Sequence, residues 1–290
     1  MYKNIAFLFI ITCLTSCQPK LYRYELNSLA NTSDSLSIAK AKNDLNQLDA
    51  QDFSKGHFTS KGHINIPYRL LKPKKIHASK TFPLVITLHN SSRIGTDNEN
   101  QLEPLARIWL KAAIRKKYPA FVLAPQFAAR STNYQYDADR KIEVSQPTDQ
   151  LLAITELIDS LKQQYPIKDI YLMGYSMGGS SVINLLNYSP TLFTAAVAIS
   201  GVPQFDNINK LQQLPIWLIH GKQDLENPFI GSEKFYEGLQ SGQRVKFWQL
   251  ENTTHHNIIS PLILGDNIPR WLFSKSAYRT KSSTGFYKKK

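Results

Sequence analysis

Residues 169–179 read DIYLMGYSMGG, and this stretch decides the fold. Its first half is a short apolar run, which is typical of a strand buried on both faces of a sheet. Its second half places glycines around Ser176, and residues 180–188 then have the apolar spacing of a helix. The sequence therefore predicts a strand, a sharp turn and a helix in direct succession, with a serine at the turn.

The turn matches the G-x-S-x-G pattern of a nucleophile elbow. Gly174 and Gly178 have no side chains, so the strand and the helix can cross closely. Ser176 then occupies a strained turn that presents its hydroxyl group above the sheet. The backbone N–H of Met177 and the start of the helix point to the place where an oxyanion would form. We therefore predict Ser176 as a nucleophile and Met177 as an oxyanion-hole donor.

Strands and helices alternate with short loops on both sides of this stretch. Such alternation is typical of an α/β fold, in which helices cover both faces of a mostly parallel sheet. We expect this domain to span residues 53–275. We expect no large lid, because the segment at 201–214, where many lipases insert one, is short. The expected strands cover residues 64–71, 83–89, 120–125, 169–174, 194–200, 215–220 and 245–250, and the expected helices cover residues 146–165, 180–188 and 267–273.

A serine hydroxyl is a weak nucleophile, so it needs a base, and a carboxylate orients that base. In this type of fold the three groups follow one another along the chain as serine, acid and histidine. Asp224 lies a few residues after the strand at 215–220 and is the predicted acid. Asp206 and Glu226 are lesser candidates for the same role.

Two adjacent histidines, His255 and His256, follow the last expected strand. Only one of them can face Ser176, and the spacing along the chain leaves the choice between them open. The histidines of the chain match no metal-ligand spacing such as H-E-x-x-H. We therefore expect catalysis without a metal or another cofactor.

Together these motifs resemble the α/β-hydrolase superfamily, and within it secreted bacterial esterases related to polyhydroxybutyrate depolymerases, feruloyl esterases and the phospholipase/carboxylesterase group. The resemblance runs from Phe53 to Phe273. It implies an ester substrate, with Ser176 as the nucleophile and Asp224 as the acid. It implies His256 as the base, because in this family the catalytic histidine is followed directly by asparagine. Besides the elbow, the resemblance is carried by PYRL at 67–70, Pro73, PLVI at 83–86, LH at 88–89, GTDNE at 95–99, LAPQ at 123–126, HG at 220–221, HN at 256–257 and WL at 271–272.

The sequence departs from this family at residues 89–95, which read HNSSRIG. The family usually has glycine where Asn90 stands, and the residue after it donates the second oxyanion N–H. By this resemblance the second donor is Ser91. Asparagine adopts left-handed backbone dihedrals more easily than most residues. The oxyanion hole is therefore expected to be intact, reshaped, or assisted by the side chain of Asn90 or Ser91.

The N-terminus, MYKNIAFLFIITCLTSC, has the features of a targeting signal. Lys3 precedes an apolar stretch that is too short to span a bilayer, and LTSC at 14–17 resembles a bacterial lipobox. We therefore expect a signal peptide at 1–16, acylation of Cys17 and a membrane anchor formed by the attached lipids. Gln18 stands in place of the aspartate associated with inner-membrane retention, which favours the outer membrane or the cell surface over the cytoplasmic membrane.

Residues 17–52 are polar and are expected to form a tether, and residues 276–290 are expected to form a basic tail. The net charge is +13, from 35 basic and 22 acidic residues, and part of the surplus lies in this tail. Nucleic-acid binding would call for a basic stripe interleaved with aromatic residues on the folded surface. The middle of the chain is only mildly basic, so we expect no nucleic-acid partner.

These observations lead to the hypothesis of a serine carboxylic ester hydrolase that acts on small or polymer-linked esters, including acylated polysaccharide. Two alternatives stay open. A serine peptidase of the prolyl-oligopeptidase type would have a similar site, but the upstream region offers no propeller or gating domain. A non-catalytic surface-binding lipoprotein on a hydrolase scaffold is supported by Asn90, because a lost oxyanion donor typically costs about 2.7–4 kcal/mol in the transition state.

Overall fold

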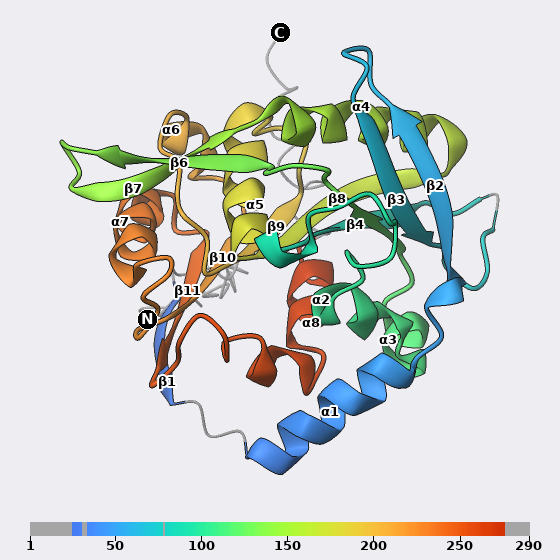
Figure 1. Cartoon of the computed structure of the whole chain (residues 1–290), viewed down its shortest axis with the longest axis horizontal. Helices are drawn as coiled ribbons and strands as arrows, with labels where there is room; N and C mark the ends of the chain where they lie inside the picture. The colour runs from blue at the N-terminus through green and yellow to red at the C-terminus, as the bar shows by residue number, and fades with distance from the viewer. Residues whose placement is uncertain (1–24, 31–33, 78, 276–290) are drawn as a thin grey trace, which may run out of the picture.

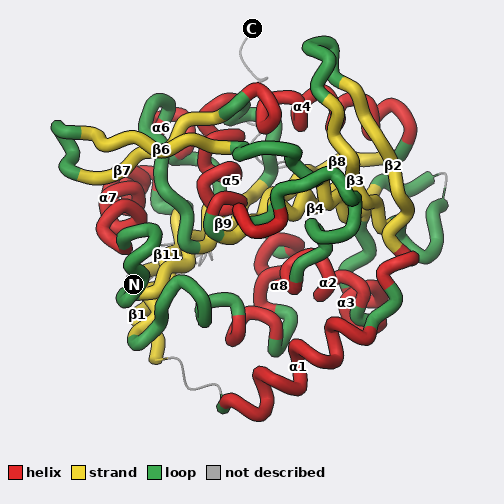
Figure 2. The backbone as a smooth tube through the Cα atoms, viewed as in Figure 1, coloured by secondary structure: helices red, strands yellow, loops and turns green. Residues whose placement is uncertain are grey.

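The computed structural model describes residues 25–30, 34–77 and 79–275 (Figure 1). The predicted signal peptide, the acylation of Cys17 and the basic tail lie outside the described residues. Within them the chain forms a nine-stranded sheet with helices packed on both faces (Figure 2).

The strands of this sheet follow the order β1-β11-β10-β9-β8-β4-β5-β3-β2. Neighbouring strands run parallel, except that β3 is antiparallel to both β5 and β2. This arrangement is the α/β-hydrolase fold, and the expected mostly parallel sheet is confirmed. The strands are β1 (Glu25–Ala30), β2 (Phe53–Thr59), β3 (Asn65–Leu71), β4 (Phe82–Leu88), β5 (Phe121–Pro125), β8 (Ile167–Tyr175), β9 (Ala195–Ile199), β10 (Ile216–Gly221) and β11 (Val245–Glu251).

Each face of the sheet carries its own apolar core, because successive side chains of a strand point to opposite faces. In β4, Leu84 and Ile86 belong to one core, whereas Val85 between them belongs to the other. All three side chains are fully buried. The first core is covered by α4 (Asp149–Gln164), α5 (Met177–Tyr188), α6 (Ile208–Leu211) and α7 (Phe229–Leu239), and the second by α1 (Ser35–Gln47), α2 (Pro104–Arg107), α3 (Ala112–Lys117) and α8 (Asn267–Phe273).

The predicted tether at 17–52 differs from the structure in its described part. Residues 25–30 form the edge strand β1, which pairs in parallel with β11. Helix α1 then packs along the second core through Leu45, which is fully buried. The guanidinium of Arg107 donates hydrogen bonds to the carbonyl oxygens of Leu45 and Leu48, at 3.0 and 2.9 Å, and so holds the end of α1. This part of the chain therefore belongs to the folded domain.

A two-stranded hairpin, β6 (Thr132–Asp137) and β7 (Ile142–Pro147), stands apart from the central sheet (Figure 1). The sequence pattern does not predict this hairpin, and the helix expected at 146–165 begins at Asp149 instead. Ser145 of the hairpin donates its backbone N–H to the carbonyl of Pro203 at 2.7 Å, and its hydroxyl oxygen accepts from the Asn184 side chain at 2.7 Å. The hairpin is thus held by the loop after β9 and by α5. That loop carries only the short helix α6, in agreement with the absence of a large lid.

We predict that Leu45→Ala lowers the free energy of unfolding by about 2–4 kcal/mol, because it leaves a cavity in the second core. Leu36 on the same helix is 81% exposed, so Leu36→Ala should change stability by less than about 0.5 kcal/mol. Urea unfolding of the two variants measures the difference. Equal stabilities would show that α1 is not part of the cooperative unit.

Candidate active site

The elbow between β8 and α5 has the predicted sharp turn. Ser176 has φ 59° and ψ −123°, a conformation that residues with side chains rarely adopt. The backbone at Gly178 lies very near β4, since a Cβ atom there would be 2.0 Å from the carbonyl oxygen of Leu88. The first turn of α5 therefore packs directly against the end of β4. The Ser176 backbone N–H donates to the carbonyl of Ile199 at 2.9 Å, which fixes the turn on its other side.

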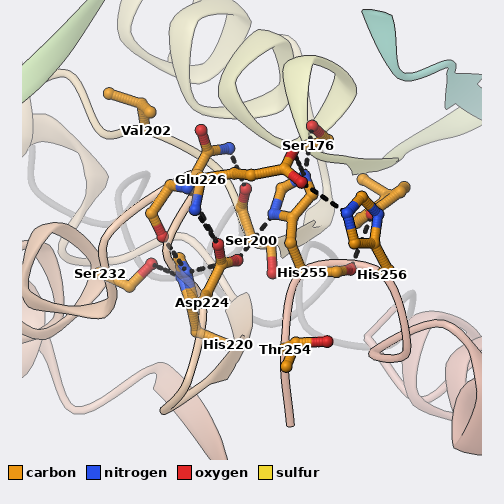
Figure 3. A network of polar contacts seen from close by, with 12 residues as sticks. Ser176, Ser200, Val202, His220, Asp224, Glu226, Ser232, Thr254, His255 and His256 are labelled. Carbon is orange, nitrogen blue, oxygen red and sulfur yellow. Dashed lines mark hydrogen bonds and ion pairs between the residues drawn. The ribbon is translucent and has the colours of Figure 1, made fainter. Parts of the chain in front are cut away.

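Three side chains form a continuous line of hydrogen bonds at the carboxyl edge of the sheet (Figure 3). The hydroxyl oxygen of Ser176 lies 2.8 Å from Nε2 of His255. Nδ1 of the same ring lies 2.8 Å from Oδ2 of Asp224. His255 and Asp224 are each 4% exposed. The structure thus brings Ser176 and Asp224 together as predicted, with a histidine between them.

The prediction that His256 is this histidine is wrong, because His255 occupies the position. The His256 side chain is 82% exposed, and its Nε2 lies 2.7 Å from Oε1 of Glu226. The loop is fixed on the other side by Tyr175, whose hydroxyl donates to the carbonyl oxygen of His255 at 2.7 Å. Asn257, which suggested His256 by resemblance, accepts from the backbone N–H of Thr254 at 2.9 Å instead. The asparagine thus shapes the turn that presents His255.

Asp224 is held ionised by the groups around it. Burial raises its pKa, but hydrogen bonds from His220, His255 and the backbone N–H of Asn227 outweigh burial, so the pKa lies below its ordinary value. Nε2 of His220 lies 3.2 Å from Oδ2 of Asp224 and 2.8 Å from the carbonyl oxygen of Asn227. Both neighbours are acceptors, so Nε2 carries the proton and Nδ1 accepts from the hydroxyl of Ser232 at 2.7 Å. A second, fully buried histidine therefore supports the carboxylate.

Asn90 needs no glycine-like backbone here, since its φ is −77°. Its side-chain oxygen accepts from the backbone N–H of Ser92 at 2.9 Å and from the Ser92 hydroxyl at 2.7 Å. Its Nδ2 donates to Oε2 of Glu103 at 2.6 Å, and Glu103 is 6% exposed. The Asn90 side chain is thus occupied in bracing its own loop. Ser91 begins the 3-10 helix Ser91–Arg93, where first-turn N–H groups have no acceptor within the helix.

His89 braces the same loop from inside. Its Nε2 accepts from the backbone N–H of Phe127 at 3.0 Å, and its Nδ1 donates to the carbonyl oxygen of Asn90 at 2.8 Å. Burial lowers the pKa of His89 to about 4, so the ring is neutral at pH 7 and keeps this pattern of one acceptor and one donor. His89 and Glu103 thereby hold the backbone around Asn90 from two directions.

The remaining sequence candidates lie elsewhere. Asp206 accepts from the Gln204 side chain at 2.8 Å, whereas the ring nitrogens of His255 and His256 face other partners. In the described ranges, no group of three His, Cys, Asp or Glu residues is arranged to hold a metal ion. None of the helices in those same ranges combines the length and apolar character that crossing a membrane requires.

Comparisons with known proteins give a consistent class. The family described as phospholipase/carboxylesterase matches residues 134–261. A solved thermostable esterase is 29% identical, with a TM-score of 0.71 over 78% of this chain and 63% of its own. The chain thus spans less than two thirds of that relative. Two further esterases share the fold. Est1E from Butyrivibrio proteoclasticus is 16% identical, with a TM-score of 0.55 over 77% of this chain and 99% of its own. The Pyrococcus furiosus esterase Pf2001 is 18% identical, with a TM-score of 0.57 over 87% of this chain and 99% of its own.

No curated protein sequence matches the chain. The fold is nevertheless that of the α/β-hydrolases, and the solved structures named above, which share it, are esterases.

The buried carboxyl group of Glu103 makes stability depend on pH. Burial raises its pKa from 4.5 to about 8, so the folded protein binds this proton more tightly than the unfolded chain does. The stability that this proton contributes is fully present below pH 4.5 and is lost as the pH rises towards 8. Glu103→Gln stays neutral. We predict that its unfolding free energy, relative to the unmodified protein, rises between pH 5 and 8 by up to about 1.4 kcal/mol per pH unit.

Urea unfolding at pH 5, 6.5 and 8 measures this difference. Glu237→Gln, on the exposed side of α7, is the matched control and should follow the unmodified protein at every pH. Parallel pH curves for Glu103→Gln and the unmodified protein would contradict the prediction.

Proposed function

We propose that the protein is a serine carboxylic ester hydrolase. The observation that carries the proposal is the line of 2.8 Å contacts from Ser176 through His255 to Asp224, placed at a strained elbow. The matched family and the thermostable esterase support the same chemistry. His255 is the proposed base, in place of His256, which the family resemblance implies.

The geometry supports acyl transfer to water. Nε2 of His255 accepts the Ser176 proton as the serine oxygen attacks the ester carbonyl, and the Nδ1–H bond to Asp224 stabilises the resulting imidazolium. The N–H groups of Met177 and Ser91 are the proposed donors to the tetrahedral oxyanion. The imidazolium then protonates the leaving alcohol, and a water molecule releases the acid from the acyl-enzyme by the same steps in reverse.

The substrate is proposed to be a small or polymer-linked ester, with acylated polysaccharide as one class. A cavity of about 230 Å³ lies between the β6–β7 hairpin, the loop after β9 and the start of α7. Its lining is mostly apolar, with Ile142, Val202 and Ile230, and also includes Lys141 and Glu143. Such a cavity is suited to hold an apolar part of an ester. One relative is a feruloyl esterase module from Clostridium thermocellum complexed with sinapinate, at 13% identity and a TM-score of 0.57, over 77% of this chain and 88% of that one.

A peptidase is the second candidate on the same site. A dipeptidyl aminopeptidase IV from Bacteroides ovatus, described as putative in its name, shares the fold at 13% identity and a TM-score of 0.53, but this chain spans only 36% of it. Parallel assays with matched ester and amide substrates separate the two activities.

The two histidines give a direct test of the catalytic proposal. Ser176→Ala and His255→Ala should each lower kcat for p-nitrophenyl butyrate by about 10³-fold or more, because the unit of nucleophile and base is lost. His256→Ala should change kcat by less than about tenfold, since its ring makes no contact with Ser176. Fluorophosphonate labelling of Ser176 reports the nucleophile independently. Undiminished turnover in the His255 variant would refute the assignment.

We further propose that the protein is anchored by lipid on Cys17, at the outer membrane or the cell surface. The lipobox-like LTSC sequence supports this proposal. Cys17→Ser should abolish incorporation of radiolabelled palmitate, because the thiol that carries the lipid is lost, and should leave the signal peptide uncleaved, because cleavage follows acylation. Unchanged labelling and cleavage of the variant would contradict it. Ser16→Ala, which keeps a small residue, is the matched control.

A further inference from the structure

Glu226 lies beside the histidine that the proposed mechanism uses, on the opposite side from Asp224 (Figure 3). It belongs to the loop between β10 and α7, and its side chain is 53% exposed. Its Oε1 lies 2.7 Å from Nε2 of His256, and its Oε2 lies 3.6 Å from Nε2 of His255. Glu226 is a lesser sequence candidate for the acid of the triad, but it lies near Nε2 of His255, whereas the acid must face Nδ1.

The position of Glu226 identifies which part of a substrate it meets. In the proposed mechanism, Nε2 of His255 receives the serine proton and hands it to the oxygen of the leaving alcohol. That oxygen must therefore come within hydrogen-bond distance of Nε2. The Glu226 carboxylate is a neighbour of the same atom, so it borders the space into which the alcohol leaves.

The charge at this place is negative. In the described part of the chain, the ion pairs of Glu226 are with the two histidines and not with a lysine or arginine. Lys222, from the same loop, pairs with Glu251 at 2.6 Å. Asp224, on the far side of the His255 ring, is ionised. Two carboxylates thus lie on the two sides of the His255 ring, in a chain whose net charge is +13.

We infer that Glu226 makes the leaving-group side of the site acidic and so determines which alcohols it accepts. This inference rests on the proposed function. Alcohols that carry a positive charge or hydroxyl donors approach a carboxylate favourably, whereas alcohols that carry a negative charge are repelled. The substrate class is therefore an ester of a cationic or hydroxyl-rich alcohol, and anionic alcohols are excluded.

The test compares kcat/KM for acetate esters that differ only in the alcohol. Acetylcholine is compared with its uncharged isostere 3,3-dimethylbutyl acetate, and glycerol monoacetate with propyl acetate. The anion 2-acetoxyethanesulfonate completes the series. Glu226→Gln keeps the shape and the acceptor for His256 but removes the charge. Glu237→Gln, at an exposed position near the end of α7, is the matched control.

In the unmodified protein and in Glu237→Gln we expect acetylcholine or glycerol monoacetate to exceed its neutral partner, and the sulfonate to be the poorest substrate. In Glu226→Gln the preference should fall by about 5- to 20-fold, and the sulfonate should gain by a similar factor. A changed preference in the acetylcholine pair shows that charge is recognised, and a changed preference in the glycerol monoacetate pair shows that hydroxyl donors are recognised. If the preference is electrostatic, the ratio of kcat/KM between the charged and the neutral ester should fall sharply at high salt.

Two results overturn the inference. The first is an unchanged order of substrates in Glu226→Gln. The second is an equal loss for every ester, because Glu226 would then act on the imidazolium and not on the alcohol. A neutral fluorophosphonate probe keeps these results apart from the proposed function itself. Failure to label Ser176 in the unmodified protein would refute the proposed hydrolase activity. Labelling of Ser176 without a preference among the alcohols would refute the role of Glu226 alone.

Discussion

The close crossing of α5 over the ends of β4 and β8 is the constraint on which the site depends. Gly178 packs against the carbonyl of Leu88 with no room for a side chain, so the chain can turn from strand to helix within one residue. That residue is Ser176, and its unusual backbone conformation costs on the order of 1–3 kcal/mol. The buried strand and helix on either side supply the stability that maintains it. The hydroxyl group is therefore presented above the sheet before any substrate arrives.

A second close approach places the other two groups of the triad. A Cβ atom at Gly221 would lie 2.2 Å from the carbonyl oxygen of Thr253, so the loops after β10 and β11 touch through their backbones. The Gln223 N–H donates to that same carbonyl at 3.0 Å. Asp224 and His255 then project from neighbouring loops towards each other. The carboxyl ends of adjacent parallel strands thus deliver residues that are distant in sequence to one line of hydrogen bonds.

The sequence predicts those parts of this arrangement that local patterns encode. The role of Ser176 is predicted by the glycines around it, which lie between an apolar run and a helical pattern. The role of Asp224 is predicted by its place after a buried strand. The choice between His255 and His256 depends on how one loop turns, and Tyr175, from a different strand, holds that loop through the carbonyl of His255. A pattern along the chain carries no record of that contact. The edge strand β1 was missed for a related reason, since its pairing with β11 joins segments that lie far apart in the sequence, and its own six residues, ELNSLA, show no clear strand pattern.

Asn90 shows how a departure from a family pattern can be compatible with the same loop geometry. Its backbone lies in the extended region, so the usual glycine is not required there for conformational reasons. The amide side chain adds bonds to Ser92 and to Glu103, and these tie the loop to a carboxyl group in the core. Burial of that carboxyl carries a cost, because its charged form is disfavoured. The cost falls on stability at high pH. Because the backbone of Asn90 is unstrained, the asparagine alone gives no reason to expect a site without catalysis.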